Sequence, residues 1–234
     1  MGLRENLERV RRELDAAARA AGRDPADVTL LAATKTQTSD AIREAVAAGI
    51  TVCGENRVQE LTAHLNDNAY EGAQVHFIGH LQTNKVKYVV GRVELIHSVS
   101  SEKLLLAIDA QAGKLRLTQD VLLEVNLAGE ESKSGFSPQE ALEAAEMVAS
   151  LSNVRLRGLM CIPPISTRAG ENLPYFEALR DLAVDIRKKI VDNSMDTLSM
   201  GMSGDWRDAV AAGSTCIRVG SALFGPRPPV SRED

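Results

Sequence analysis

The chain has 234 residues, of which 44% are hydrophobic and 25% charged, and its formal net charge is −5 at pH 7. This composition is typical of a globular protein, and the length suits one large α/β domain or two small ones. No apolar run approaches the ~20 residues that a membrane helix needs, and the first residues lack the pattern of a secretory signal. The negative charge and the 3% aromatic content argue against a nucleic-acid-binding surface. We therefore expect a cytoplasmic protein that binds a small ligand and contacts neither membrane nor nucleic acid.

Strands and helices are predicted to alternate after one N-terminal helix. In that helix apolar residues recur every three or four positions over 3–18, and Asp24-Pro25 closes it. The eight predicted strands span 28–34, 50–53, 76–78, 94–98, 120–127, 154–160, 197–200 and 215–219. The predicted helices between them span 39–48, 57–65, 84–90, 102–112, a segment that starts at 137, 175–190 and 205–212. Ser39 is predicted to cap the first of these helices, and Ser137 to open the fifth with a capping box.

This alternation predicts the fold class. Parallel strands need crossover connections, so strands that alternate with helices form a parallel sheet. The first strand is apolar on both faces, which is typical of a sheet covered on both sides. Eight such units in about 200 residues favour a closed barrel over an open doubly wound sheet. We therefore predict an α/β protein: a single (β/α)8 TIM barrel domain over residues 1–234, with an extra N-terminal helix.

Polar residues at the carboxyl ends of the strands are the functional candidates, because (β/α)8 enzymes place their sites there. Lys35 directly follows the first strand, where a lysine with a lowered pKa can form a Schiff base with an aldehyde. The competing interpretation is a lysine whose stem packs at the strand end, or that forms a structural ion pair. Asn56, after the second strand, could hydrogen-bond a ligand, while Glu55 and Arg57 beside it could pair with each other.

Metal and disulfide chemistry are not predicted. His76 and His80 lie four residues apart, but a strand end and a glycine separate them, so we expect His80 to hydrogen-bond a ligand instead. Cys53, Cys161 and Cys216 are too far apart in the sequence for a zinc site of the Cys-x-x-Cys type. Cys161 follows the sixth strand without a clear base partner, so we expect it to pack at the barrel rim.

The last two strand ends hold the strongest local pattern. Residues 199–205 join a strand to a helix through small residues and the Ser203 hydroxyl, and the next strand ends in Arg218-Val-Gly220-Ser221. Helix N-terminal amides and serine hydroxyls bind phosphate, and these two loops are where (β/α)8 enzymes most often hold one. Ordinary capping and turn chemistry is the competing interpretation. Barrel closure would place Lys35 beside this predicted phosphate site. An amine next to a phosphate site suits pyridoxal 5′-phosphate (PLP), and Arg218 would then face the ring nitrogen.

Six motifs, in order, resemble those of the PLP homeostasis proteins, small PLP-binding barrels similar to the barrel domain of alanine racemase. The motifs are Ala33-Thr-Lys35, Gly54-Glu-Asn-Arg-Val-Gln-Glu60, His76-Phe-Ile-Gly-His-Leu-Gln-Thr-Asn-Lys85, Val125-Asn126 with Glu131-Ser-Lys-Ser-Gly135, Ser199-Met-Gly-Met-Ser203 and Arg218-Val-Gly-Ser221. The resemblance runs from about Leu3 to Gly225 and implies a fold-type III PLP barrel. It implies that Lys35 holds PLP as a Schiff base. It also implies that Ser203, Gly220 and Ser221 surround the phosphate and that Arg218 lies near the ring nitrogen. With Asn56, His80 and Met200, these residues complete the predicted PLP-binding set.

Catalysis is not expected. An arginine at the ring nitrogen carries a fixed positive charge and disfavours ring protonation, which makes PLP a weaker electron sink. Racemisation needs one base on each face of the PLP aldimine. In the racemases that this barrel resembles, the second base is a tyrosine of an additional domain. Tyr70, Tyr88 and Tyr175 lie in or beside predicted helices, and the sequence ends where that domain would begin.

We therefore predict a PLP carrier that takes part in intracellular PLP (vitamin B6) homeostasis. A PLP-dependent amino-acid racemase that uses Lys35 is the alternative, and a sugar-phosphate enzyme without PLP is the third possibility. PLP-dependent apo-enzymes are the expected protein partners. We expect a monomer, because the interface of the racemases involves the additional domain.

Overall fold

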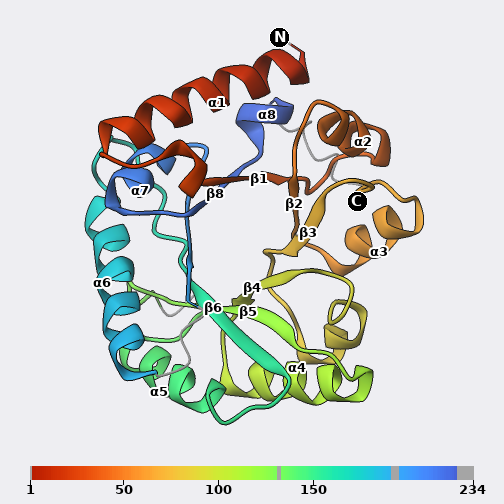
Figure 1. The fold of residues 1–234 in the computed structure, drawn as a ribbon, viewed down its shortest axis with the longest axis vertical. Helices are drawn as coiled ribbons and strands as arrows, with labels where there is room; N and C mark the ends of the chain where they lie inside the picture. The colour runs from red at the N-terminus through yellow and green to blue at the C-terminus, as the bar shows by residue number, and fades with distance from the viewer. Residues whose placement is uncertain (1, 131–132, 191–194, 226–234) are drawn as a thin grey trace, which may run out of the picture.

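Eight parallel strands close into a barrel in the computed structural model, which describes residues 2–130, 133–190 and 195–225. The strands are β1 (Thr29–Ala33), β2 (Val52–Glu55), β3 (Gln74–Phe77), β4 (Leu95–Val99), β5 (Gln119–Glu124), β6 (Val154–Met160), β7 (Thr197–Met202) and β8 (Cys216–Val219). β8 closes the barrel against β1, with Thr29 opposite Cys216 and Leu31 opposite Arg218. Figure 1 shows the helices as an outer ring around the strands. The predicted (β/α)8 barrel is confirmed for these residues, while 226–234 and the motif residues Glu131 and Ser132 lie outside the described ranges.

The helices follow the strands in the predicted order. They are α1 (Leu3–Ala20), α2 (Ser39–Ala47), α3 (Val58–Asn66), α4 (Glu102–Leu115), α5 (Pro138–Val148), α6 (Leu173–Lys189), α7 (Trp206–Ala212) and α8 (Ser221–Phe224), with 3-10 helices η1 (Pro25–Asp27) and η2 (Thr83–Tyr88). The capping box at Ser137 is confirmed, because its hydroxyl accepts from the Glu140 N–H and the Glu140 carboxylate accepts from the Ser137 N–H. The predicted cap at Ser39 is wrong. Thr38 occupies that position, and its hydroxyl accepts from the Ala41 N–H over 3.2 Å.

The N-terminal helix α1 packs against α7 and α8 on the outside of the barrel (Figure 1). Its apolar stripe is buried, and two of its polar side chains hold α8. Asn6 Nδ2 donates to the Leu223 carbonyl over 3.0 Å, and Arg9 Nη2 donates to the Ala222 carbonyl over 3.1 Å. α8 leaves no signal in the sequence, because four residues are too few to show a helical period. α1 therefore supports the segment that carries Ser221.

Side chains of the strands alternate between the helix layer and the barrel interior. The outward-facing set packs with the helices in one large core. The interior contains two smaller apolar clusters, one of Leu31, Ala33, Val52, Ile78 and Cys216 and one of Leu95, Leu122 and Met160. Four buried polar residues share that interior: His76, His97, Ser199 and Arg218. The barrel centre is thus partly polar, unlike the apolar layers that are usual in this fold.

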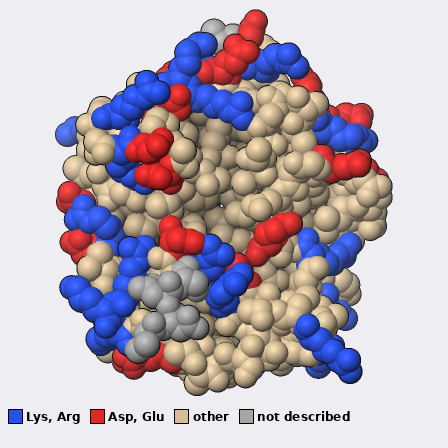
Figure 2. All heavy atoms as spheres, viewed as in Figure 1, with Lys and Arg blue, Asp and Glu red and all other residues tan. Residues whose placement is uncertain are grey.

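Charges on the surface are locally mixed. On the face turned toward the viewer in Figure 2, basic and acidic side chains lie next to one another rather than separating by sign. Among the described helices, none is long and apolar enough to cross a membrane.

Candidate ligand-binding site at the carboxyl ends of the strands

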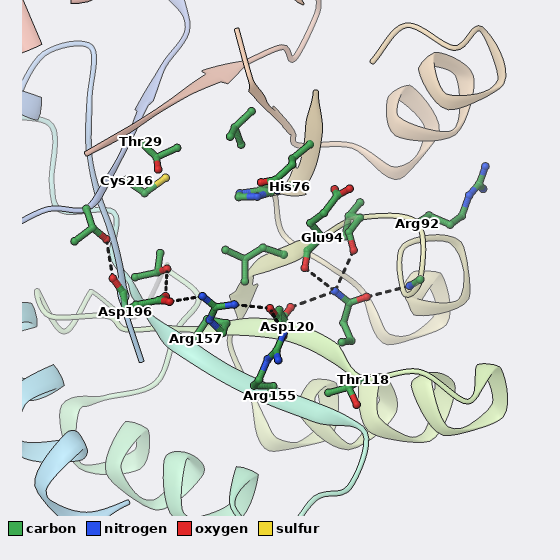
Figure 3. A pocket seen from close by; sticks show the side chains of 18 of the residues that line it. Thr29, His76, Arg92, Glu94, Thr118, Asp120, Arg155, Arg157, Asp196 and Cys216 are labelled. Atoms are coloured by element: carbon green, nitrogen blue, oxygen red, sulfur yellow. Dashed lines mark hydrogen bonds and ion pairs between the residues drawn. The ribbon is translucent and has the colours of Figure 1, made fainter. Parts of the chain in front are cut away.

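Two cavities lie at opposite ends of the barrel. The amino-end cavity, of 750 Å³, is lined by residues that begin strands, such as Thr29, Gln74 and Gln119 (Figure 3). The carboxyl-end pocket, of 390 Å³, is lined by residues that end or follow strands, such as Ala33 and Met202. Small-molecule sites measure about 300–1,000 Å³, and (β/α)8 enzymes bind their ligands at the carboxyl ends. The carboxyl-end pocket is therefore the candidate site, although the other cavity is larger.

Four charged side chains of the amino-end cavity form ion pairs with one another. Arg155 donates to Asp120 through two nitrogens, over 2.6 and 2.8 Å. Arg157 bonds both Asp120, at 2.9 Å, and Asp196. Figure 3 shows this series of ion pairs along one side of the cavity. Because the pairs join β5, β6 and the start of β7, their evident effect is to tie neighbouring strands together.

The carboxyl-end pocket brings the first strand together with the last two. Six of the predicted PLP-binding residues line it: Lys35, Asn56, Ser203, Arg218, Gly220 and Ser221. Apolar side chains complete much of the wall: Ala33, Ile78, Ile162, Met202 and Phe224. With Gln37, which also lines it, the pocket thus combines an amine, two hydroxyls, two amides and a guanidinium with an apolar surface against which a ring can pack.

Lys35 is positioned by a sharp turn after β1. Thr36 has a φ of 65°, in the left-handed region that β-branched residues rarely adopt. The Thr36 N–H donates to Glu60 Oε2 over 3.1 Å, which ties this turn to α3. Such a conformation costs roughly 1–3 kcal/mol and persists where the surrounding structure enforces it, commonly at functional sites. The turn directs the lysine into the pocket rather than along the strand.

Arg218 enters the pocket from inside the barrel. It is only 5% exposed, with Nη1 donating to the Ser199 hydroxyl over 2.5 Å and Nη2 to the Cys161 carbonyl over 2.9 Å. Burial lowers the pKa of Arg218, although an arginine stays protonated at neutral pH. Within the described chain no carboxylate lies at ion-pair distance from it. The pocket therefore contains a buried positive charge held by neutral acceptors, which favours an anionic ligand.

Asn56 and Gly204 show where a ligand would fit. The buried Oδ1 of Asn56 has no hydrogen-bond partner in the described chain, and an unsatisfied buried polar atom costs roughly 1–3 kcal/mol. Rotation of the amide exchanges its oxygen and nitrogen, so it can offer a ligand either an acceptor or a donor. Around Gly204, the position that a Cβ would take has no atom within 4 Å, so the space beside Ser203 is open.

Two predicted PLP-binding residues lie outside the pocket lining. Met200 is fully buried in the core between β7 and the helices, because alternation along the strand turns Ser199 inward and Met200 outward. His80 is exposed, and its Nδ1 lies 3.2 Å from the Ser134 hydroxyl. Membership of a sequence motif therefore does not determine which way a side chain points.

The predicted pairing of Glu55 with Arg57 is wrong. Glu55 is fully buried, where its Oε1 accepts from the Tyr70 hydroxyl at 2.8 Å and lies 3.0 Å from His64 Nδ1. Arg57 is exposed and pairs with Glu60 at 3.4 Å. Burial and the Glu55 carboxylate raise the pKa of the Tyr70 phenol well above its ordinary value. This tyrosine is therefore held protonated outside the pocket.

Cys161, which was expected to pack at the barrel rim, packs in the large core and is 1% exposed. Burial raises the pKa of its thiol to about 12, so it is not a nucleophile at neutral pH. Its backbone carbonyl, which had no predicted role, accepts from Arg218. In the described ranges no group of three His, Cys, Asp or Glu side chains could hold a metal ion.

A series of hydrogen bonds crosses the barrel interior behind Arg218. His76 Nδ1 lies 3.0 Å from His97 Nε2, and His97 Nδ1 lies 2.8 Å from the Ser199 hydroxyl. Burial lowers the pKa of His76 to about 4, and burial with the nearby charges of His76 and Arg218 lowers the pKa of His97 well below its ordinary value. Both rings are therefore neutral at pH 7. No role was predicted for His97 or Ser199. The signal that the sequence offers for them is a polar residue at an inward position of an apolar strand.

We predict that His76 makes the fold sensitive to acid. Between about pH 6.5 and 4 the unfolded chain binds a proton that folded His76 does not, so stability falls as pH falls through that window. From His76 alone, the free energy of unfolding should drop by about 2 kcal/mol between pH 7.5 and pH 5.0. Urea denaturation of the wild type and of His76→Gln at both pH values measures this, and equal losses in the two proteins would contradict the prediction.

Fold and pocket together define a barrel of the alanine racemase type. The family model described as alanine racemase, N-terminal domain, matches residues 5–228. The pyridoxal phosphate homeostasis protein of Aquifex aeolicus is 42% identical over 223 residues, covering 95% of this chain and 97% of that protein. Its counterpart in Pseudomonas aeruginosa is 42% identical over 224 residues, covering 95% of each chain. The structure of PipY from Synechococcus elongatus with PLP bound matches with a TM-score of 0.84 and 35% identity, covering 95% of this chain and 100% of that one. The chain belongs to the pyridoxal phosphate homeostasis protein family.

Proposed function

We propose that residues 1–234 form one PLP-binding domain that holds PLP as a Schiff base with Lys35, and that the protein is a cytoplasmic PLP carrier without catalytic turnover. The observation that carries the proposal is the convergence of Lys35, Ser203, Ser221 and Arg218 on one pocket of 390 Å³. PipY, 35% identical to this chain, has been solved with PLP bound, which supports the same ligand here.

Five polar side chains of the pocket each suit the binding of PLP. The Lys35 amine suits the PLP aldehyde, because an amine and an aldehyde form a Schiff base. The hydroxyls of Ser203, which lies beside open space, and Ser221 suit the phosphate. The Asn56 amide can hydrogen-bond the ligand, and the Arg218 guanidinium suits a ring nitrogen that is not protonated.

Absence of turnover is supported by the lining of the pocket. A racemase needs a second base opposite the lysine, and the described lining contains no tyrosine, histidine or second lysine. Tyr70 is bonded to Glu55 instead. The fixed charge of Arg218 also weakens the bound ring as an electron sink. A racemase that uses Lys35 and a base from outside this lining is the alternative.

One experiment tests the binding proposal directly. Protein incubated with PLP and gel-filtered should absorb at ~420 nm, and borohydride should abolish the band and fix the added mass on Lys35. A colourless protein that binds sugar phosphates would contradict the proposal. Production of D-amino acids above the blank rate, lost in Lys35→Ala, would establish the racemase instead.

We predict that Arg218→Ala weakens PLP retention and shifts the absorbance of the bound form. The variant removes the buried charge that faces the ligand, and a hydrogen bond to a charged group contributes about 1.5–3 kcal/mol, equivalent to roughly 10- to 150-fold in affinity. Titration of the ligand-free protein with PLP, followed by absorbance, measures both quantities. Unchanged affinity and spectrum would remove Arg218 from the site.

PLP-dependent apo-enzymes are the proposed recipients, and a monomer is the proposed state. Ile162, which lines the pocket and is 39% exposed, gives an apolar side chain that supports a contact there. Size-exclusion chromatography with light scattering tests the monomer. Transfer of PLP to an apo-enzyme at a rate above that of free exchange tests the recipients.

A further inference from the structure

Arg218 is positioned by two hydrogen bonds to neutral groups. Nη1 donates to the Ser199 hydroxyl at 2.5 Å and Nη2 donates to the Cys161 carbonyl at 2.9 Å. The acidic side chains that face it, Glu124 and Asp205, act from beyond ion-pair distance. The second of these bonds uses the backbone, so Ser199 is the side chain that decides where the guanidinium lies.

Ser199 is itself held from the opposite wall of the barrel. His97 Nδ1 lies 2.8 Å from the Ser199 hydroxyl, and His97 Nε2 lies 3.0 Å from His76 Nδ1. Ser199 is on β7, whereas His97 and His76 are on β4 and β3, so these bonds cross the interior. Ser199 and His97 are fully buried, and His76 reaches the amino-end cavity (Figure 3).

The hydrogen-bonding capacities of these groups define the arrangement. Arginine can only donate, so the Ser199 oxygen must accept from Arg218. A neutral histidine has one donor and one acceptor nitrogen, so His97 Nδ1 can either donate to the Ser199 hydroxyl or accept its proton in a hydrogen bond. The Cys216 thiol is the other hydrogen-bonding neighbour of that hydroxyl. A charged His97 would instead repel Arg218, and its burial beside that cation disfavours the charged form.

We propose that Ser199, supported by His97, is a positioning residue that holds the Arg218 guanidinium at the floor of the carboxyl-end pocket and thereby sets the electronic state of the bound PLP ring. This inference rests on the proposed function. A hydroxyl anchor does not itself neutralise the positive charge of Arg218, whereas a carboxylate anchor at ion-pair distance would cancel much of it. The remaining positive charge therefore acts on the ring nitrogen and hinders its protonation.

Ser214 provides a matched control for Ser199. It is also a fully buried serine, and its hydroxyl donates to the Met200 carbonyl at 2.8 Å without contacting Arg218. Ser199→Ala and Ser214→Ala each remove one buried hydroxyl, so both should lower the melting temperature. Only Ser199→Ala should weaken PLP retention, by about tenfold. Only Ser199→Ala should also move the midpoint, the pH at which the absorbance change of bound PLP is half complete, and in the same direction as Arg218→Ala moves it.

Wild-type affinity and midpoint in Ser199→Ala would overturn the proposal, as would equal changes in the two serine variants. His97→Leu tests the support behind Ser199. It should move the midpoint in the same direction by a smaller amount, and an unchanged midpoint in folded His97→Leu would overturn the part assigned to His97.

A measurement without PLP separates this inference from the proposed function. In the ligand-free protein, NMR should show the Arg218 guanidinium N–H groups protected from solvent exchange in the wild type and in Ser214→Ala. Exchange should be at least about tenfold faster in Ser199→Ala, because one of the two anchors is gone. Equal protection in all three proteins would overturn the anchor. A wild-type protein that gains no absorbance band with PLP would instead refute the proposed function.

Discussion

Lys35→Ala is expected to abolish the ~420 nm band and the mass that borohydride adds, because no other group of the described pocket lining is an amine. Binding that remains should depend on the phosphate contacts alone and be weaker by at least about two orders of magnitude, since the covalent bond contributes to retention. Absorbance after gel filtration and intact-protein mass after reduction measure the two effects. A residual band of wild-type intensity would show that PLP is bound elsewhere.

Two control variants make the Lys35 result specific. Lys35→Arg keeps a positive charge but cannot form the Schiff base, so it should also lose the band while retaining more phosphate-dependent binding than the alanine variant. Lys103→Ala removes an exposed lysine of α4 and should behave as the wild type. Loss of the band in both Lys35 variants and its retention in Lys103→Ala would assign the chemistry to Lys35.

Gly79→Ala is expected to destabilise the barrel by about 3 kcal/mol and to disturb the pocket at the same time. A Cβ at Gly79 would lie 2.0 Å from the backbone oxygen of Asn56, a distance that atoms cannot adopt. The segment cannot retreat easily, because the Ile78 N–H donates to the Glu55 carbonyl at 2.8 Å and the Ser98 hydroxyl donates to the Gly79 carbonyl at 2.5 Å. The Asn56 backbone must move, and its side chain lines the pocket.

Urea denaturation and PLP titration of Gly79→Ala measure the two consequences. Gly204→Ala is the control for stability, because a Cβ there meets no atom within 4 Å. It should unfold at the wild-type urea concentration. A Gly79→Ala protein as stable as this control would mean that the loop after β3 accommodates the methyl group, contrary to the contacts that hold it.

These expectations depend on different levels of information. Hydrophobic runs and their spacing were sufficient to predict eight strands alternating with helices, because burial of both faces of a parallel sheet leaves a strong signature in the chain. The motifs at the strand ends were sufficient to select Lys35, Ser203, Arg218 and Ser221, because in this fold every strand delivers its carboxyl end to the same side. Barrel closure then brings β8 against β1, with Leu31 opposite Arg218.

The amino-acid sequence by itself thus determined the order of the elements, the barrel and most of the polar side chains that line its carboxyl-end pocket. Only the tertiary structure decided which way each side chain points and which distant groups meet. Met200 turns outward, Glu55 is buried with Tyr70, and Ser199 meets His97 across the barrel. Local periodicity specifies that neighbouring strand residues face opposite sides, but strand register and closure decide which side is the interior and what lies across it.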